Sequence, residues 1–219
     1  MSSAKEEILR RIRRATRDVP ADERPEDVLV ERGYRKEDDA PREELVERFA
    51  ENVAEYEATV HRVNEAGLPR AIADACQRRG VQRLVVPADV PEEWVPEGVE
   101  LLRDGAAGRR LSNEELDACD GVLTGCSLGI AQTGTIVLDA GEGQGRRALT
   151  LLPDYHLCVV REGQISGLVP EAFARLEDAA KGEGRPITLI SGPSATSDIE
   201  LDRVEGVHGP RTLEVLIVG

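Results

Sequence analysis

Aromatic side chains are scarce in this sequence, which has two Phe, three Tyr and one Trp among its 219 residues. The core must therefore be built from Leu, Val, Ile and Ala. Long hydrophobic runs are missing as well, because none approaches the ~20 apolar residues that a membrane-spanning helix needs. The N-terminus is rich in arginine, but no apolar segment of the kind found in secretory signals follows it. We therefore expect a cytoplasmic protein without a membrane span.

Cysteine and basic charge are also limited. The four cysteines lie far apart and form no CxxC pair, which argues against a disulfide framework and against an iron–sulfur site built from this chain alone. Lys and Arg number 28 against 42 Asp and Glu, so the formal net charge is -14. A general nucleic-acid binder needs a basic face to neutralise phosphates, and we therefore expect no nucleic-acid partner.

The N-terminal part of the chain differs in pattern from the rest. Within residues 3–17, Ile8, Leu9, Ile12 and Ala15 recur at helical spacing and predict a surface helix, docked on the body or on a neighbouring subunit. Glu6, Glu7 and the overall charge weigh against the alternative of a membrane-surface helix. Residues 20–44 are dominated by charge and read as a solvated connector. We divide the chain into a helix with an acidic connector, residues 1–40, and an α/β domain, residues 41–219.

The domain alternates helical and strand patterns. We predict helices near 41–53, 69–79, 112–119 and 170–180, the third opened by a capping box from Ser112 to Glu115. Strands are predicted near 57–63, 84–86, 121–123, 135–138, 157–160, 187–190 and 213–218. The core strands are continuous apolar runs, which suits burial on both faces. Most connections are too short for a crossover helix, so the fold class is α/β with a mixed sheet flanked by helices.

Two glycine-containing motifs resemble known sites but lack the required context. Residues 125–129 match G-x-S-x-G, yet a strand rather than a helix follows Ser127, so a nucleophile elbow is disfavoured. Residues 141–145 resemble a phosphate loop, but residues 146–152 read as a strand, and a β-hairpin turn explains the glycines better. Arg146 or Arg147 could reach an anionic ligand from that turn, although such arginines are more often solvated.

Polar residues gather at the ends of the predicted core strands. Residues 129–135 place threonines between two strands, where they could face a cleft, although composition alone favours a tight structural turn. Asp154 and His156 share a face if this segment is extended, although a lone histidine entering a strand is more often structural. Residues 191–200 are rich in hydroxyl and acidic side chains, and His208 precedes the last strand. His156, His208, Asp198 and Glu200 show no metal-ligand spacing, so we predict no metal site.

In chain order, the motifs Gly-Ile-Ala-x-Thr-Gly-Thr, Leu-Pro-Asp-Tyr-His, Ser-Gly-Pro-Ser-x-Thr-x-Asp-Ile-Glu and Gly-Val-His-Gly-Pro resemble the LutC/YkgG family of lactate utilization proteins, built on the LUD domain. The resemblance runs from Arg42 to the C-terminus. It implies a fold similar to the NagB/RpiA/CoA-transferase-like superfamily. It also implies an accessory role in an iron–sulfur system that oxidises L-lactate to pyruvate, with the clusters on partner subunits and no cofactor bound by this chain. Members often carry Glu where this chain has Gln132, which cannot act as a base.

We therefore expect one binding cleft at the end of the sheet, where a small carboxylate such as lactate or pyruvate could bind. Its predicted lining is Gln132, Thr133, Thr135, His156, Ser191, Ser194, Asp198, Glu200 and His208. One alternative is a stand-alone transferase or isomerase acting on a CoA ester or a sugar phosphate, with Glu200 supplying the carboxylate that Gln132 lacks. Another is an interaction module whose motifs only shape the fold.

Overall fold

The computed structural model describes residues 4–20, 22–24, 30–31, 33–182, 184–197, 203–205 and 209–219. The chain consists of two compact units, Met1–Tyr34 and Arg35–Gly219. The boundary expected from the sequence at residues 40 and 41 stays a prediction. No helix in the described ranges is long and apolar enough to cross a membrane.

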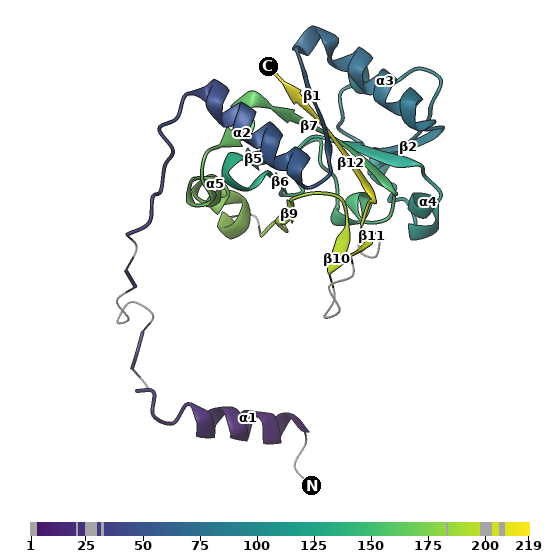
Figure 1. Ribbon diagram of the computed structural model, residues 1–219. Coiled ribbons are helices and arrows are strands. Elements are labelled where there is room, and N and C mark those ends of the chain that lie inside the picture. The colour runs from purple at the N-terminus through teal and green to yellow at the C-terminus, as the bar shows by residue number, and fades with distance from the viewer. Residues whose placement is uncertain are drawn as a thin grey trace. The chain divides into compact units, whose positions relative to one another are not determined.

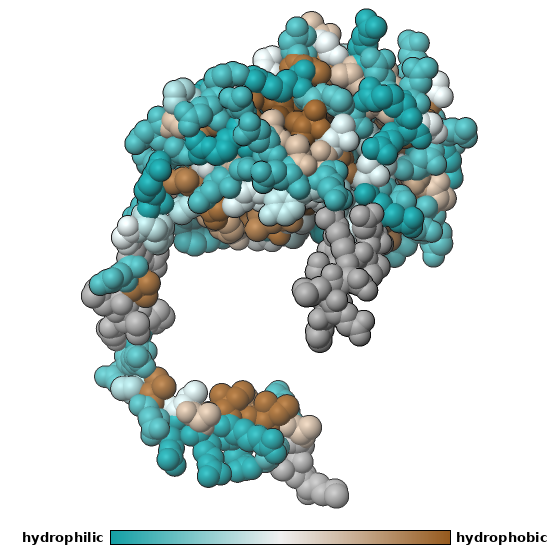
Figure 2. All heavy atoms as spheres, in the orientation of Figure 1, coloured by the Kyte–Doolittle hydropathy of each residue, from teal (hydrophilic) through white to brown (hydrophobic). Residues whose placement is uncertain are grey.

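The smaller unit contains the predicted N-terminal helix, α1 (Ala4–Ala15). Glu7 lies about one helical turn before Arg10 and Arg11, and its carboxylate accepts hydrogen bonds from both, at 2.7 and 2.8 Å. Ile8, Leu9 and Ile12 are exposed, and Figure 2 shows apolar side chains gathered along one side of this helix. The helical periodicity of the sequence is thus confirmed.

The larger unit is built on a six-stranded parallel sheet (Figure 1). Its strand order is β1 (Thr59–Val63), β12 (Thr212–Val218), β7 (Tyr155–Arg161), β4 (Gly121–Thr124), β2 (Arg83–Pro87) and β3 (Glu100–Asp104). Strands β7 and β12 lie inside the sheet and are buried along almost their whole length. Their continuous apolar sequences are therefore those of strands covered on both faces, as predicted.

A second sheet carries the mixed pairing. Its order is β8 (Ile165–Ser166), β5 (Leu128–Ile130), β6 (Thr135–Leu138) and β9 (Thr188–Ile190). Strand β6 is antiparallel to both β5 and β9, whereas β5 and β8 are parallel. Strands β10 (Ala195–Ser197) and β11 (Arg203–Glu205) form a separate antiparallel pair. The predicted α/β class with a mixed sheet is confirmed, with parallel and mixed pairing divided between two sheets.

Helices cover both faces of the six-stranded sheet. Phe49 and Val53 of α2 (Arg42–Glu55) pack in a core cluster with side chains of β6, β7 and β12. Ile72 of α3 (Leu68–Arg79) packs in another cluster, with Leu123 and Leu157. The alternation of side chains along a strand therefore separates the two clusters onto opposite faces. Helix α3 ends at Arg79, as predicted, and the glycine that follows and terminates it, Gly80, has a φ of 65°.

The remaining helices are short. Helix α4 (Asn113–Asp117) begins with the predicted capping box between Ser112 and Glu115. Helix α5 (Val169–Arg175) is shorter than the predicted 170–180, because a wider turn follows at Asp178–Gly182. The spacing of Phe173 and Leu176 predicts that they share one face of this helix, but Leu176 is buried whereas Phe173 is exposed. Single turns occur at Glu65–Gly67, Glu92–Trp94, Ala106–Gly108, Ala131–Thr133, Arg147–Thr150 and Glu162–Gln164.

The predicted hairpin at the glycine-rich segment is wrong. Residues 146–152 form no strand, and Arg147–Thr150 is a 3-10 turn, η6, with Leu149 buried. The glycine loop instead bonds across the carboxyl ends of β2 and β4: Gly125 N donates to Gly143 O at 2.8 Å, and Gly143 N donates to Asp89 Oδ2 at 2.9 Å. Because these long-range bonds hold the glycine loop, residues 146–152 do not pair with β6 as the second strand of a hairpin.

Candidate functional site

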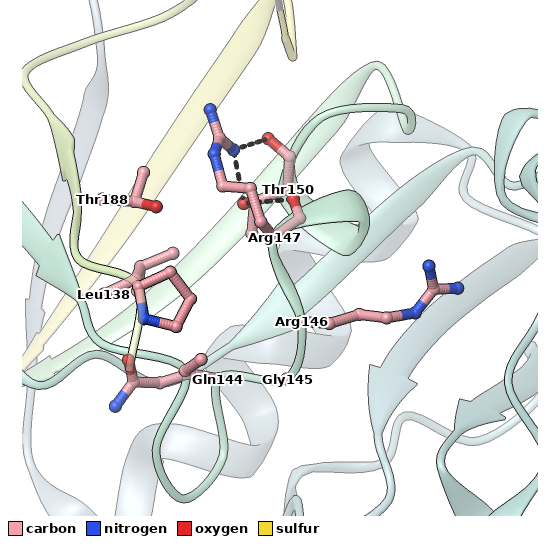
Figure 3. Close-up of a pocket in the computed structure, with 9 residues that line it drawn as sticks. Leu138, Gln144, Gly145, Arg146, Arg147, Thr150 and Thr188 are labelled. Carbon is pink, nitrogen blue, oxygen red and sulfur yellow. Dashed lines mark hydrogen bonds between the residues drawn. The ribbon is translucent and has the colours of Figure 1, made fainter. Parts of the chain in front are cut away.

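A small pocket opens where β6 ends, with an empty volume of about 230 Å³ that is partly open to solvent. Leu138 of β6 pairs with Thr188 of β9, and these strand ends form one wall together with Ala140 and Pro186. The opposite wall comes from the glycine loop and η6 (Figure 3). It is lined by Gln144, Gly145, Arg146, Arg147 and Thr150.

The loop that shapes the pocket is held by buried polar contacts. Gln144 is buried, and its amide accepts from Asp139 N at 2.6 Å and donates to Asp139 Oδ1 at 2.8 Å. Asp139 Oδ2 forms an ion pair with Arg185 at 3.1 Å. Ala140 has a φ of 55°, a left-handed conformation that costs energy for a residue with a Cβ. The surrounding contacts therefore fix this wall of the pocket before any ligand arrives.

The two adjacent arginines have different roles. Arg146 extends away from Leu138 and Thr188 (Figure 3), forms an ion pair with the buried Asp104 at 3.0 Å, and also donates to Leu111 O at 2.6 Å. Arg147 turns back to η6, where Nη1 donates to Thr150 Oγ1 at 2.9 Å and to Thr150 O at 3.2 Å. Arg146 is thus a neutralised structural cation, and Arg147 is held by neutral oxygen atoms.

Arg147 has no carboxylate partner within the described part of the chain. Partial burial lowers the pKa of its guanidinium, and no acidic group offsets that effect. A guanidinium stays charged in proteins at any ordinary pH. The mouth of the pocket therefore carries a positive charge that the described residues do not neutralise. Together with threonine hydroxyls this suits a small anion, while none of the described lining residues is a carboxylate or an imidazole.

The structure brings three of the predicted cleft residues together. Thr135 Oγ1 lies 2.7 Å from Thr133 Oγ1 and 2.8 Å from Ser191 Oγ. Gln132 is adjacent in sequence, and its side-chain oxygen accepts from Val169 N at 3.3 Å. Thr135 shares its strand face with Val137, which packs against α5. This group therefore lies on the α5 side of the second sheet.

His156 belongs to another layer. It is buried in β7, and its Nε2 lies 2.8 Å from Thr124 Oγ1, a residue outside the predicted set. It shares a strand face with Cys158, which packs in the cluster between the two sheets. The structure therefore places His156 on the opposite side of the second sheet from Thr135.

Two buried thiols adjoin this histidine. The pKa of Cys126 is raised mainly by its hydrogen bond to Cys158 and secondly by its burial. A hydrogen bond from Cys126 is the largest cause that lowers the pKa of Cys158, and a bond from His156 acts in the same direction. Residues 126 and 158 are far apart in sequence, so only the pairing of Thr124 with Cys158 on β7 reveals the group.

Ser194 lies closer to the pocket. Its backbone N donates to Pro210 O at 2.7 Å. A Cβ built on Gly209 would lie 3.5 Å from Ser194 Cβ and 3.9 Å from Thr150 O. The predicted Ser194 segment thus borders η6, which forms one wall of the pocket.

The remaining predictions on the site stay open. Asp198, Glu200 and His208 lie outside the described residues. Among the residues that are described, no group of three or more His, Cys, Asp or Glu could hold a metal. A single cleft formed by all nine predicted residues stays a prediction. Ser127 precedes strand β5, and its N donates to Val137 O, so the local fold differs from a strand–helix nucleophile elbow.

The sequence does not identify the two hydroxyl-bearing residues of the pocket, Thr150 and Thr188, or its apolar wall of Leu138, Ala140 and Pro186. The sequence indicates Arg146 or Arg147 as an anion contact, but no sequence signal distinguishes the two residues. The distinction depends on Asp104, which is distant in sequence and which accepts from Arg146. Thr188 reaches the pocket only because β9 pairs with β6.

This chain is similar to known proteins over most of its length. A family model described as LUD domain matches residues 46–218. Lactate utilization protein C of Deinococcus radiodurans is 49% identical over 178 residues, which cover 81% of each chain. The uncharacterized protein YkgG of Escherichia coli is 33% identical over 165 residues and 71% of each chain. A crystal structure of a DUF162 family protein from Deinococcus radiodurans superposes with a TM-score of 0.71 and 42% identity, covering 82% of this chain and 99% of that one.

Proposed function

The chain belongs to the LUD domain family, together with LutC and YkgG, and from this premise we propose that it serves lactate utilization. Its proposed role is that of an accessory component of an iron–sulfur system that oxidises L-lactate to pyruvate. The observation that carries the proposal is the 49% identity to a lactate utilization protein C over 81% of both chains.

The chemistry of the described residues supports an accessory role. The four cysteines lie in three different core clusters: Cys76 in one, Cys119 in another, and Cys126 with Cys158 in a third. An iron–sulfur cluster is usually held by four thiolates that converge on it. In the proposal the clusters therefore belong to partner subunits, and the electrons of lactate oxidation pass through those subunits in the cytoplasm.

The stand-alone transferase or isomerase has less support. Proton transfer by such an enzyme needs a positioned acid or base. None of the described residues that line the pocket carries a carboxylate or an imidazole. No observation specifically favours this alternative, and we do not propose it.

Growth tests the proposed function. The gene is deleted in a strain without a paralogue, and growth is compared with L-lactate and with glucose as the sole carbon source. We expect loss of growth on lactate, unchanged growth on glucose, and restoration by the wild-type gene. Normal growth of the deletion strain on lactate would contradict the proposal.

Affinity capture tests the accessory role. The tagged chain is purified from lactate-grown cells, and the iron content and visible absorption of the eluate are measured. Iron–sulfur subunits that copurify in repeated experiments would support the proposal. Their repeated absence, with L-lactate oxidation by the purified chain alone, would contradict it.

A further inference from the structure

The pocket beside η6 has an excess of positive charge among the described residues. Arg146 is paired with Asp104, and Arg185 is paired with Asp139. Arg147 also borders the pocket, but its guanidinium donates only to neutral oxygens of Thr150. Although the chain has a net charge of -14, this cation at the pocket mouth has no carboxylate partner among the described residues. The local balance favours a ligand with one negative charge.

The walls restrict the shape and the size of that ligand. The free space beside these walls is about 230 Å³ when the open solvent in front of them is included, so the pocket is shallow and a ligand in it stays partly exposed. The pocket is too small to enclose a CoA ester or a nucleotide. Leu138, Ala140 and Pro186 provide apolar surface, while Thr188 provides a hydroxyl.

We propose that this pocket binds a small monocarboxylate with a 2-hydroxy or 2-oxo group, and that Arg147 is its anion contact. The planar guanidinium matches a carboxylate with two parallel N–H donors. Nη1 is engaged with Thr150, which orients the side chain, and the remaining donors are available to the ligand. Thr188 hydrogen-bonds the 2-oxygen, and the apolar wall accepts a methyl group.

The choice of three-carbon acids within this class rests on the proposed function, whereas the carboxylate class rests on the pocket itself. Inorganic phosphate is the competing anion. It lacks an apolar group to cover Leu138, and it carries more negative charge at neutral pH than the pocket offsets. L-lactate, pyruvate, acetate and phosphate therefore separate the two ligand chemistries.

The test is isothermal titration of the full chain with these four anions at constant ionic strength. We expect L-lactate or pyruvate to bind more tightly than acetate and phosphate. Arg147→Gln should weaken that binding by about tenfold or more, because it removes a charge-assisted hydrogen bond. Arg147→Lys keeps the charge without the planar fork and should give an intermediate affinity. Thr188→Val should weaken the binding of lactate more than that of acetate.

Arg110→Gln is the matched control, because Arg110 is exposed and does not line the pocket. It changes the net charge by the same amount and should bind as the wild type does. The unfolding temperatures of all variants are measured to establish that they are folded. Equal affinity of wild type and Arg147→Gln for lactate and pyruvate, or tighter binding of phosphate, would overturn the inference.

The titration tests the ligand inference and the growth experiment tests the proposed function, so each can fail without the other. If the deletion strain cannot grow on lactate but the purified chain binds neither three-carbon acid, the ligand inference is wrong and the proposed function stands. If the chain binds pyruvate through Arg147 but the deletion strain grows normally on lactate, the proposed function is wrong and the pocket still binds carboxylates.

Discussion

At the scale of single residues, a distant partner decides what each arginine of the pair 146–147 does. The two positions are equivalent in sequence. Asp104 accepts two hydrogen bonds from Arg146, at 3.0 and 3.1 Å, and a third from Leu111 N at 2.8 Å. It thereby fixes Arg146 in the structure and leaves Arg147 for the pocket.

Asp104→Asn should destabilise the fold, because it leaves the partly buried Arg146 without its counter-charge. We expect the free energy of unfolding to fall by about 3 kcal/mol, as for other broken buried ion pairs. The exposed pair of Arg103 with Glu92 gives the control, since the Glu92 side chain is 84% exposed. Glu92→Gln should change stability by less than about 1 kcal/mol. Equal losses in urea unfolding of the two variants would contradict this account.

Cys76 should make stability depend on alkaline pH. Burial, and secondarily Glu214, raises its pKa from the ordinary 9.0 to about 11. Between these values the thiol is ionised in the unfolded chain but protonated in the folded one, so unfolding releases a proton. The free energy of unfolding should therefore fall as pH rises from 9 to 11, by at most about 3 kcal/mol from this group. Below pH 9 the contribution is complete.

Urea unfolding between pH 8 and 11 measures this effect. Cys76→Ala leaves a cavity and should be less stable than the wild type at pH 8. Its stability should nevertheless decline less steeply between pH 9 and 11. Parallel stability curves for the two proteins would show that the Cys76 thiol has the same pKa in both states.

At the scale of secondary-structure elements, close approach of α2 to the turn before β6 requires a glycine. Gly134 has a φ of 58°, and a Cβ there would lie 2.4 Å from the carbonyl carbon of Asn52. Asn52 also donates to Ala131 O at 2.7 Å. The helix and the turn are therefore in direct backbone contact.

Gly134→Ala should cost more than about 3 kcal/mol of unfolding free energy, because it adds a backbone clash to an unfavourable φ. Gly98 is the control, since its φ is 79° and no atom lies within 4 Å of a built Cβ. Gly98→Ala should cost only about 1 kcal/mol. Similar unfolding temperatures for the two variants would rule out the clash.

The sequence predicts those elements whose signals are local. The capping box at Ser112, the Gly80 terminator and the apolar runs of β7 and β12 depend on nearest neighbours and on burial, and all are confirmed. The sequence predicts a strand at residues 146–152, and this prediction is wrong because their conformation depends on bonds that the glycine loop makes to Gly125 and Asp89. Such contacts leave no periodic pattern in the sequence.

At the scale of the whole molecule, the order of the strands decides which polar residues can meet. The sequence places Thr133, Thr135 and Ser191 at or beside strands, as the structure has them at or next to β6 and β9. It does not reveal that a second sheet separates His156 from Thr135. It also does not reveal that β9 brings Thr188 opposite Leu138. The α/β class and the family were therefore predictable, whereas the pocket required the three-dimensional arrangement.

The most direct test of this account is a crystal structure of the protein grown with saturating pyruvate or L-lactate. We predict a carboxylate within hydrogen-bond distance of the Arg147 guanidinium, with the 2-oxygen at Thr188. A carboxylate bound instead at Thr133, Thr135 and Ser191, with the pocket beside η6 empty, would contradict the account.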